Sequence, residues 1–138
     1  MISILDLVKG TNNTKFYEPL TNNRYKVYII KSKDKVLYIG ATKSSIRRRL
    51  YEGLRAKGVG GYSGYKWKNY SSVILFVYTF NNLVKLEAES IEAELVYLFR
   101  EKTGYWPECQ NEIHFNNEYS NGKLIAKKIY DQISKTKY

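Results

Sequence analysis

The stretch VLYIGATKSSIRRRL, residues 36–50, carries most of the information about the fold. Its first five residues are β-branched or aromatic apart from a leucine and a glycine, which is typical of a strand. A similar run, YKVYII over 25–30, precedes it, and only KSKDK separates the two. We therefore predict a β-hairpin. Ser44 or Ser45 can cap the helix that follows, whose first turn carries three arginines.

The remaining apolar patterns predict a mixture of strands and helices. A continuous apolar run of strand length indicates a central strand covered on both faces, and apolar residues at helical spacing indicate helices. The expected elements are a short helix over 3–9, a central strand over 73–80, a long helix over 86–104, a strand within 105–115 and a basic amphipathic helix over 121–137. We predict one α+β domain over 1–138, with a small central antiparallel β-sheet of three or more strands flanked by helices.

The composition favours a polyanionic binding partner. The chain has 138 residues, 43% of them hydrophobic, so it can bury a core. Its net charge of +10 favours DNA, RNA or an acidic membrane as partner; the alternative is a soluble protein that is merely basic. Cys109 is the single cysteine, which excludes an intrachain disulfide and suits a reducing cytoplasm. No run approaches transmembrane length, so we expect a cytoplasmic protein without a membrane span.

The hairpin carries two tyrosines that can share one face of the sheet. Tyr28 and Tyr38 are ten residues apart, and a turn centred near Lys33 would place them directly opposite each other. Gly40 would then end the strand and let a backbone or a phosphate approach closely. The alternative is a cross-strand tyrosine pair that only stabilises the hairpin, and the hairpin alone favours that alternative.

The arginines that follow are not equivalent. Ile46 and Leu50 mark the buried face of their helix, and Arg49 lies close to that face, where it can be held against the sheet. Arg48 takes an intermediate position, and Arg47 points towards solvent. A guanidinium held beside the sheet suits a phosphate, because its planar fork donates two parallel hydrogen bonds.

The helix over 86–104 places a carboxylate among apolar residues. At about 100° per residue, Glu92 falls between Val96 and Phe99, inside the apolar arc. A carboxylate there is paired, neutral or bound to a cation. The residues leave two interpretations open, an ion pair with Arg49 or a lysine, and a ligand of a hard divalent cation such as Mg²⁺.

Together these residues resemble the GIY-YIG nuclease family, over roughly 25–111. The first family motif, Gly-Ile-Tyr, corresponds to Lys26-Val27-Tyr28 without its glycine, and the second is intact as Tyr38-Ile39-Gly40. The family arginine maps to Arg49, with Arg48 as the alternative. The family glutamate maps to Glu92, within a matching pattern over 87–96.

Two further family positions are less clear in this chain. The late asparagine that follows a proline corresponds to Gln110 or Asn111, and the two stay open. A histidine or tyrosine four residues after the arginine is replaced by Gly53. The tyrosines that could substitute for it are Tyr51, Tyr62 and Tyr65.

The resemblance implies a divalent-metal-dependent endonuclease that hydrolyses DNA phosphodiester bonds. Glu92 would hold Mg²⁺ or Mn²⁺, Arg49 would stabilise charge on the phosphate, and Tyr28 would orient or deprotonate the attacking water. Tyr38 would hydrogen-bond Tyr28 or the phosphate, and Gln110 or Asn111 would tie the last segment to the site. One alternative is a catalytically inactive nucleic-acid-binding module that retains the fold; another is a basic structural protein.

Nucleic acid would contact basic and aromatic residues outside this site. The partner is expected to be DNA, with RNA left open, and a stand-alone enzyme that cuts both strands would form a homodimer. Lysines of the last helix, Lys123, Lys127 and Lys128, would add phosphate contacts. The expected contact residues are Lys43, Arg48, Lys57, Tyr62, Tyr65, Lys66 and Lys68.

Overall fold

A computed structural model of the chain describes the strands, the two long helices and the segments next to them. The described residues are 2–8, for the backbone alone, together with 23–32, 35–46, 48, 72–80, 82–108 and 119–135. Most of the range 105–115, within which a strand is expected, lies outside these ranges.

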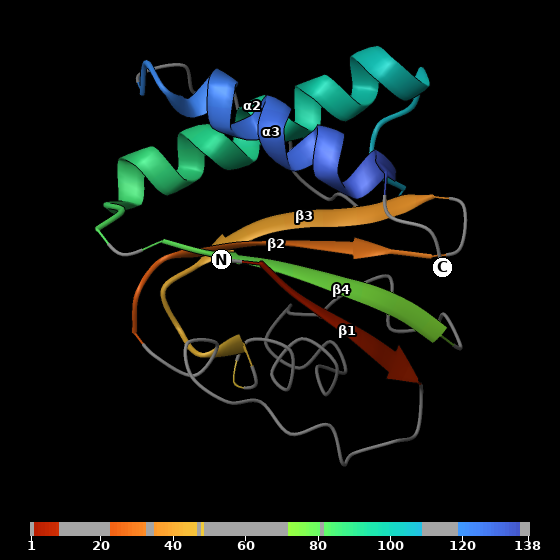
Figure 1. Cartoon of the computed structure of the whole chain (residues 1–138), viewed down its shortest axis with the longest axis horizontal. Helices are drawn as coiled ribbons and strands as arrows, with labels where there is room; N and C mark the ends of the chain where they lie inside the picture. Colours follow the sequence, from red (N-terminus) through yellow and green to blue (C-terminus); the bar gives the residue numbers. More distant parts are fainter. Residues whose placement is uncertain are drawn as a thin grey trace, which may run out of the picture.

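Four antiparallel strands form one sheet, in the order β1-β4-β2-β3 (Figure 1). Their bounds are β1 Ile2–Val8, β2 Lys26–Lys31, β3 Val36–Thr42 and β4 Ser72–Thr79. The predicted α+β fold with a small antiparallel sheet is therefore confirmed, and so is the central position of the strand over 73–80.

The expected helix over 3–9 is wrong, because this segment is strand β1. It pairs with β4 along its whole length, from Ile2 opposite Tyr78 to Val8 opposite Ser72. A helix of seven residues is marginal in water, since few hydrogen bonds repay its costly first turn. Pairing with a central strand satisfies the same backbone groups, and this tertiary partner decides the conformation.

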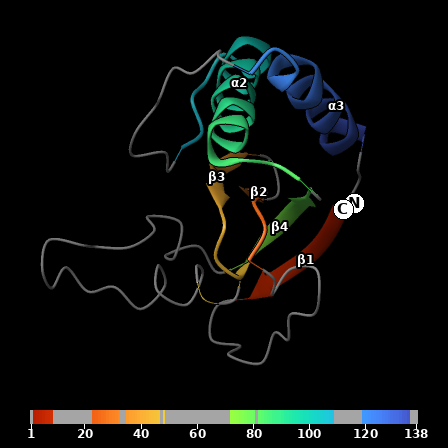
Figure 2. The same cartoon turned by 90° about the vertical axis from the view of Figure 1, so that its left-hand side faces the viewer.

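Two helices lie on one face of the sheet. They are α2 (Lys85–Thr103) and α3 (Gly122–Lys135), with α2 over β3 and α3 beside α2 (Figures 1 and 2). Helix α2 ends where the sequence predicted, at Gly104, which has a left-handed φ of 83° and donates its N–H to the Arg100 carbonyl at 3.0 Å. None of the helices within the described residues is long and apolar enough to cross a membrane.

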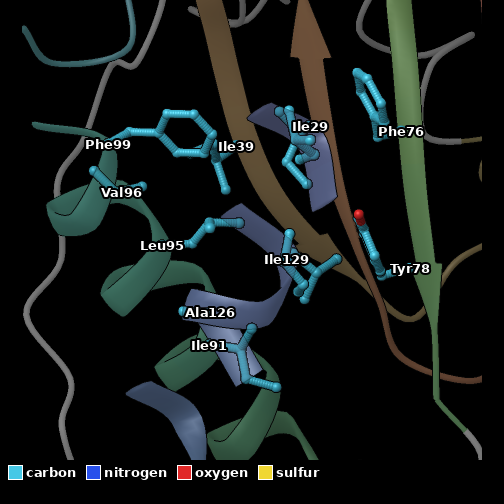
Figure 3. Close-up of a cluster of buried hydrophobic side chains, with 12 residues drawn as sticks. Ile29, Ile39, Phe76, Tyr78, Ile91, Leu95, Val96, Phe99, Ala126 and Ile129 are labelled. Carbon is cyan, nitrogen blue, oxygen red and sulfur yellow. The ribbon is translucent and has the colours of Figure 1, made fainter. Parts of the chain in front are cut away.

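The core lies between the sheet and the two helices. Figure 3 shows Ile29, Ile39 and Phe76 of the sheet opposite Leu95 of α2 and Ile129 of α3. Full burial of such a side chain stabilises the fold by about 1.5–3 kcal/mol. The other face of β4 is closed as well, since Val73, Leu75 and Val77 are buried, so β4 is covered on both faces as predicted.

The hairpin register differs from the expected one. Tyr28 pairs with Gly40, and Tyr38 pairs with Ile30. The two tyrosines therefore share a face but lie diagonally rather than directly opposite. An irregularity between Ile30 and Lys31, a β-bulge that hydrophobic periodicity does not reveal, accounts for part of this shift, and the pairing of Lys31 with Val36 accounts for the rest.

Candidate active site

One face of β2 and β3 turns away from the helices and carries the predicted tyrosines. Side chains alternate along a strand, and Val27, Ile29 and Ile39 pack into the core on the helix side. The intervening residues therefore lie on the other face, which we call the tyrosine face. Its residues are Lys26, Tyr28 and Ile30 on β2 and Tyr38, Gly40 and Thr42 on β3.

The two phenol rings lie side by side on this face. Their centroids are 5.9 Å apart, and their planes are tilted by 31°. Tyr28 is fully buried, with 0% of its surface exposed, whereas Tyr38 is only half-buried. The structure thus brings together the two tyrosines that the sequence singled out, with different access to solvent.

Gly40 explains how the Tyr28 ring is held. A Cβ atom at this position would lie 2.6 Å from both Cζ and the hydroxyl oxygen of Tyr28, closer than atoms can approach. The missing side chain therefore leaves the space that the Tyr28 ring occupies. The expectation that Gly40 ends the strand is wrong, since β3 continues to Thr42, and the close approach at Gly40 is made by a tyrosine of the same sheet.

Lys26 is a feature of this face that the sequence analysis missed. It replaces the glycine of the first family motif, and it is fully buried. Its ammonium group donates hydrogen bonds to the carbonyls of Arg24 at 2.7 Å and Ser44 at 3.3 Å. A buried charge needs such partners, because its desolvation is costly. A lysine inside an apolar strand was the available signal for a buried ammonium.

The contact with Ser44 connects the tyrosine face to the start of the arginine-bearing segment. The Thr42 hydroxyl accepts a hydrogen bond from the Ser44 N–H at 3.2 Å, and the Ser45 hydroxyl accepts one from the Arg48 N–H at 3.2 Å. Because an N-cap side chain bonds the N–H three residues later, Ser45 is the cap. Ile46 is fully buried, as predicted, and Arg48 is exposed.

Glu92 is half-buried on α2, among apolar neighbours. Ala88, Leu95 and Val96 lie one helical turn away on the same side of α2, and all three are buried. Helix α2 packs against β3 and β2 from the side opposite the tyrosine face. Glu92 and the two phenols therefore come from opposite sides of β3, the strand at the end of the sheet order.

The donor set fits a cation bound by few protein groups. Within the described part of the chain, no cluster of three or more His, Cys, Asp or Glu side chains could form a metal cage. A single carboxylate nevertheless suits Mg²⁺ or Mn²⁺, which keep several water ligands and accept substrate phosphate oxygens. The half-buried carboxylate of Glu92 has the hard oxygen donors that such an ion prefers.

Several predicted site residues lie outside the described residues. Of the expected nucleic-acid contacts, the structure describes Lys43, Arg48 and the three lysines of α3, Lys123, Lys127 and Lys128, and all of them are exposed. The residues outside are Arg49, Gln110 and Asn111 of the catalytic set, Lys57, Tyr62, Tyr65, Lys66 and Lys68 of the contact set, and Tyr51 and Gly53.

Comparison with protein families identifies the chain. The model of the GIY-YIG catalytic domain matches residues 24–105, more than half of the sequence. The chain belongs to the GIY-YIG family. Neither the curated proteins nor the solved structures give a match. The matched range runs from just before β2 to just after α2, so the family domain includes the tyrosine face and Glu92, and β1 and α3 lie outside it. Membership in this family indicates a nuclease-type function.

Proposed function

We propose that this GIY-YIG protein is a divalent-metal-dependent endonuclease that hydrolyses DNA phosphodiester bonds. The observation that supports the proposal most directly is the tyrosine pair, whose rings lie 5.9 Å apart with Tyr28 seated over Gly40. Both motif tyrosines are held on one face, and that face continues through Thr42 into the capped segment with the arginines.

The two phenols would have different tasks. Tyr38 is half-buried and would contact the scissile phosphate, whereas Tyr28 is closed to solvent and would orient the attacking water once the substrate opens the tyrosine face. An ordinary phenol, with a pKa near 10, keeps its proton at neutral pH. Hydrogen bonding is therefore the first role of Tyr28, and the buried ammonium of Lys26 adds positive charge to the same face.

The remaining groups would stabilise charge. Arg49, with Arg48 as the alternative, would donate paired hydrogen bonds to the phosphate as negative charge develops. Glu92 would hold Mg²⁺ or Mn²⁺, which when bound supplies positive charge for the phosphate and the leaving oxygen. Gln110 or Asn111 would tie the segment after α2 to the site.

Exposed cations near the tyrosine face would position the substrate. Lys43 and Arg48 follow β3 directly, and both are exposed. They would bind backbone phosphates and add salt-sensitive affinity without reading sequence. We expect Lys57, Tyr62, Tyr65, Lys66 and Lys68 to extend this surface. Residues 25–111 would form the catalytic core, and cleavage of both strands would require a homodimer.

A plasmid-nicking assay with Mg²⁺ or Mn²⁺ tests the proposal. Replacing Glu92 by glutamine should lower cleavage about 1,000-fold while DNA binding is retained, because removal of an electrostatic catalytic group costs ~10²–10³ in rate and loss of the metal ligand adds to it. Glu94→Gln is the matched control, since Glu94 is a half-buried carboxylate on the same helix. Unchanged cleavage by the Glu92 variant would refute the metal assignment.

A second candidate function is a nucleic-acid-binding module without catalysis. Two observations favour it: Lys26 replaces the motif glycine, and Tyr28 is fully buried. This candidate predicts salt-sensitive binding of DNA and no cleavage by the unmodified protein with either metal. Metal-dependent nicking that disappears with EDTA would exclude it.

A further inference from the structure

A pocket lies on the helix side of the hairpin, away from the tyrosine face. Its volume is about 810 Å³, within the usual range for small-ligand sites. The turn of the hairpin, the ends of α2 and α3 and the segment after α2 surround it. We call it the aromatic pocket. Its lining includes two lysines and four aromatic residues, Lys31, Lys35, Phe99, Tyr105, Trp106 and Tyr130.

The turn that carries Tyr105 and Trp106 is held in place from both ends. The Thr103 hydroxyl donates to the Phe99 carbonyl at 2.6 Å and accepts the Tyr105 N–H at 3.2 Å. Further along, the Glu108 N–H donates to the Val36 carbonyl of β3 at 3.1 Å. These contacts fix the position of the two aromatic residues before any ligand arrives, which lowers the entropic cost of binding.

The aromatic rings are arranged as a preformed platform. Trp106 packs edge-on against Tyr97, with ring centroids 5.4 Å apart, and the Arg100 guanidinium lies 5.5 Å from the indole centroid. On the other wall, Phe99 and Tyr130 form a similar pair at 4.9 Å. Tyr105 nevertheless remains 79% exposed and Trp106 41% exposed. Large aromatic surfaces left in water beside a pocket indicate a ligand with a flat apolar face.

The charges at the pocket favour an anion. Lys31 is half-buried and Lys35 is exposed in its lining. Lys35 pairs with Glu108 at 3.6 Å, but both side chains are well exposed, so this ion pair is weak and easily exchanged for another anion. The pocket thus combines stacking surfaces with ammonium groups within one concave site.

We propose that the aromatic pocket binds one unpaired nucleotide, with its base stacked on Trp106 or Tyr105 and its phosphate near Lys31 and Lys35. Aromatic side chains stack on any base, and lysines add backbone attraction, which is the usual composition of single-strand contacts. The inference rests on the proposed function only in taking nucleic acid as the partner. The pocket would hold a single-stranded end or an extruded base, separately from the tyrosine face.

Tryptophan fluorescence tests this directly, in EDTA so that no cleavage occurs. The chain has two tryptophans, so Trp67→Phe leaves Trp106 as the single reporter. A five-nucleotide oligothymidylate should quench its emission in a saturable way, and a blunt duplex long enough to stay fully paired should not. In that background, Tyr105→Ala and Lys31→Gln should each weaken binding about tenfold, because stacking and phosphate contacts are lost.

Lys85→Gln is the matched control, because it removes the same charge at the opposite end of α2 and should change the affinity less than twofold. Anisotropy of a labelled oligonucleotide measures binding independently of Trp106. Binding by anisotropy without quenching would overturn the inference, as would equal effects of the Lys31 and Lys85 variants. Nicking by the unmodified protein is scored separately, so the proposed function and the pocket can fail independently.

Discussion

The two faces of the β2–β3 pair differ in chemistry although the same two strands form both. The helix face presents Val27, Ile29 and Ile39, which are fully buried against apolar side chains of α2 and α3. The tyrosine face also buries Lys26 and Tyr28 completely, but it buries an ammonium group and a phenol. Burial alone therefore does not distinguish a core from a candidate site, whereas the polar atoms that are buried do.

A second buried tyrosine sharpens this comparison. Tyr78 of β4 lies on the helix face, is 7% exposed and donates its hydroxyl to the Gln132 side-chain oxygen of α3 at 3.3 Å. Its polar tip thus connects two packed elements. Tyr28 instead packs over a glycine on the face turned away from α2 and α3, beside the half-buried Tyr38. The same side chain has a structural task on one face and, in our proposal, a catalytic task on the other.

The largest expected effect on stability is at the helix face. Ile29→Ala removes a fully buried side chain and should lower the free energy of unfolding by about 3 kcal/mol, measured by urea denaturation followed by circular dichroism. Leu124→Ala is the control, since Leu124 is 55% exposed and its loss should cost less than about 0.5 kcal/mol. Cleavage per folded molecule should be unchanged in both. If the Ile29 variant stays folded but loses cleavage, the assignment of a structural task to the helix face and a catalytic task to the tyrosine face is wrong.

The hydroxyl of Tyr28 should matter for cleavage more than for folding. Tyr28→Phe is expected to lower the rate constant for nicking per folded molecule about 100-fold, because the group that orients the water is lost. Tyr78→Phe should do the reverse. It should lower the free energy of unfolding by about 1 kcal/mol, because the hydrogen bond to Gln132 is lost, and it should keep full cleavage activity. If the two variants lose cleavage equally, the assignment of Tyr28 to the chemistry is wrong.

Gly40→Ala should damage both properties at once. The added methyl group would meet the Tyr28 ring at 2.6 Å, so either the ring or the strand must move. Overpacking of this kind costs about 2 kcal/mol, and the displaced phenol should lower cleavage about tenfold. Gly104→Ala is the comparison: it has no atom within 4 Å of the added methyl but a φ of 83°, so backbone strain should cost about 1 kcal/mol without affecting the nicking rate.

The smallest effects are expected from surface lysines. Lys43→Gln, next to the tyrosine face, should weaken duplex binding a few-fold. It should also reduce the slope of log affinity against log salt concentration by about one, because one phosphate contact is lost. Lys102→Gln removes an exposed charge from the last turn of α2, on the other side of the sheet, and should change binding less than twofold. Filter binding over a range of salt concentrations measures both. A larger effect at Lys102 than at Lys43 would place the DNA on α2 and contradict the proposed orientation.

Much of the fold follows from local patterns in the sequence. Strands β2, β3 and β4 and helices α2 and α3 lie where apolar periodicity predicted them, and Gly104 ends α2 as expected. Ile46 is buried and Ser45 is the cap, in agreement with the pattern. Strand β1 was missed because its conformation depends on pairing with β4, which lies more than sixty residues further along the chain.

The sequence predicted which residues belong to the candidate site better than it predicted how they are arranged. The spacing of Tyr28 and Tyr38 put both on one face, and family membership supports their choice. The diagonal register, the role of Gly40 beneath Tyr28 and the burial of Lys26 were not predicted. Each depends on a bulge or on contacts between residues distant in sequence, and a one-dimensional pattern does not encode either.

By itself, the sequence determined which segments form the hairpin and the long helices, and which residues match the GIY-YIG family. It did so because side-chain alternation and helical periodicity are local properties, and because the motif residues stand at readable spacings. The tertiary structure alone decided that Tyr28 lies over Gly40, that Lys26 is buried against the Ser44 carbonyl, and that Tyr105 and Trp106 stand beside a pocket. Those arrangements arise when strands and helices pack together, since each balances the space, charge and hydrogen bonds of several elements at once.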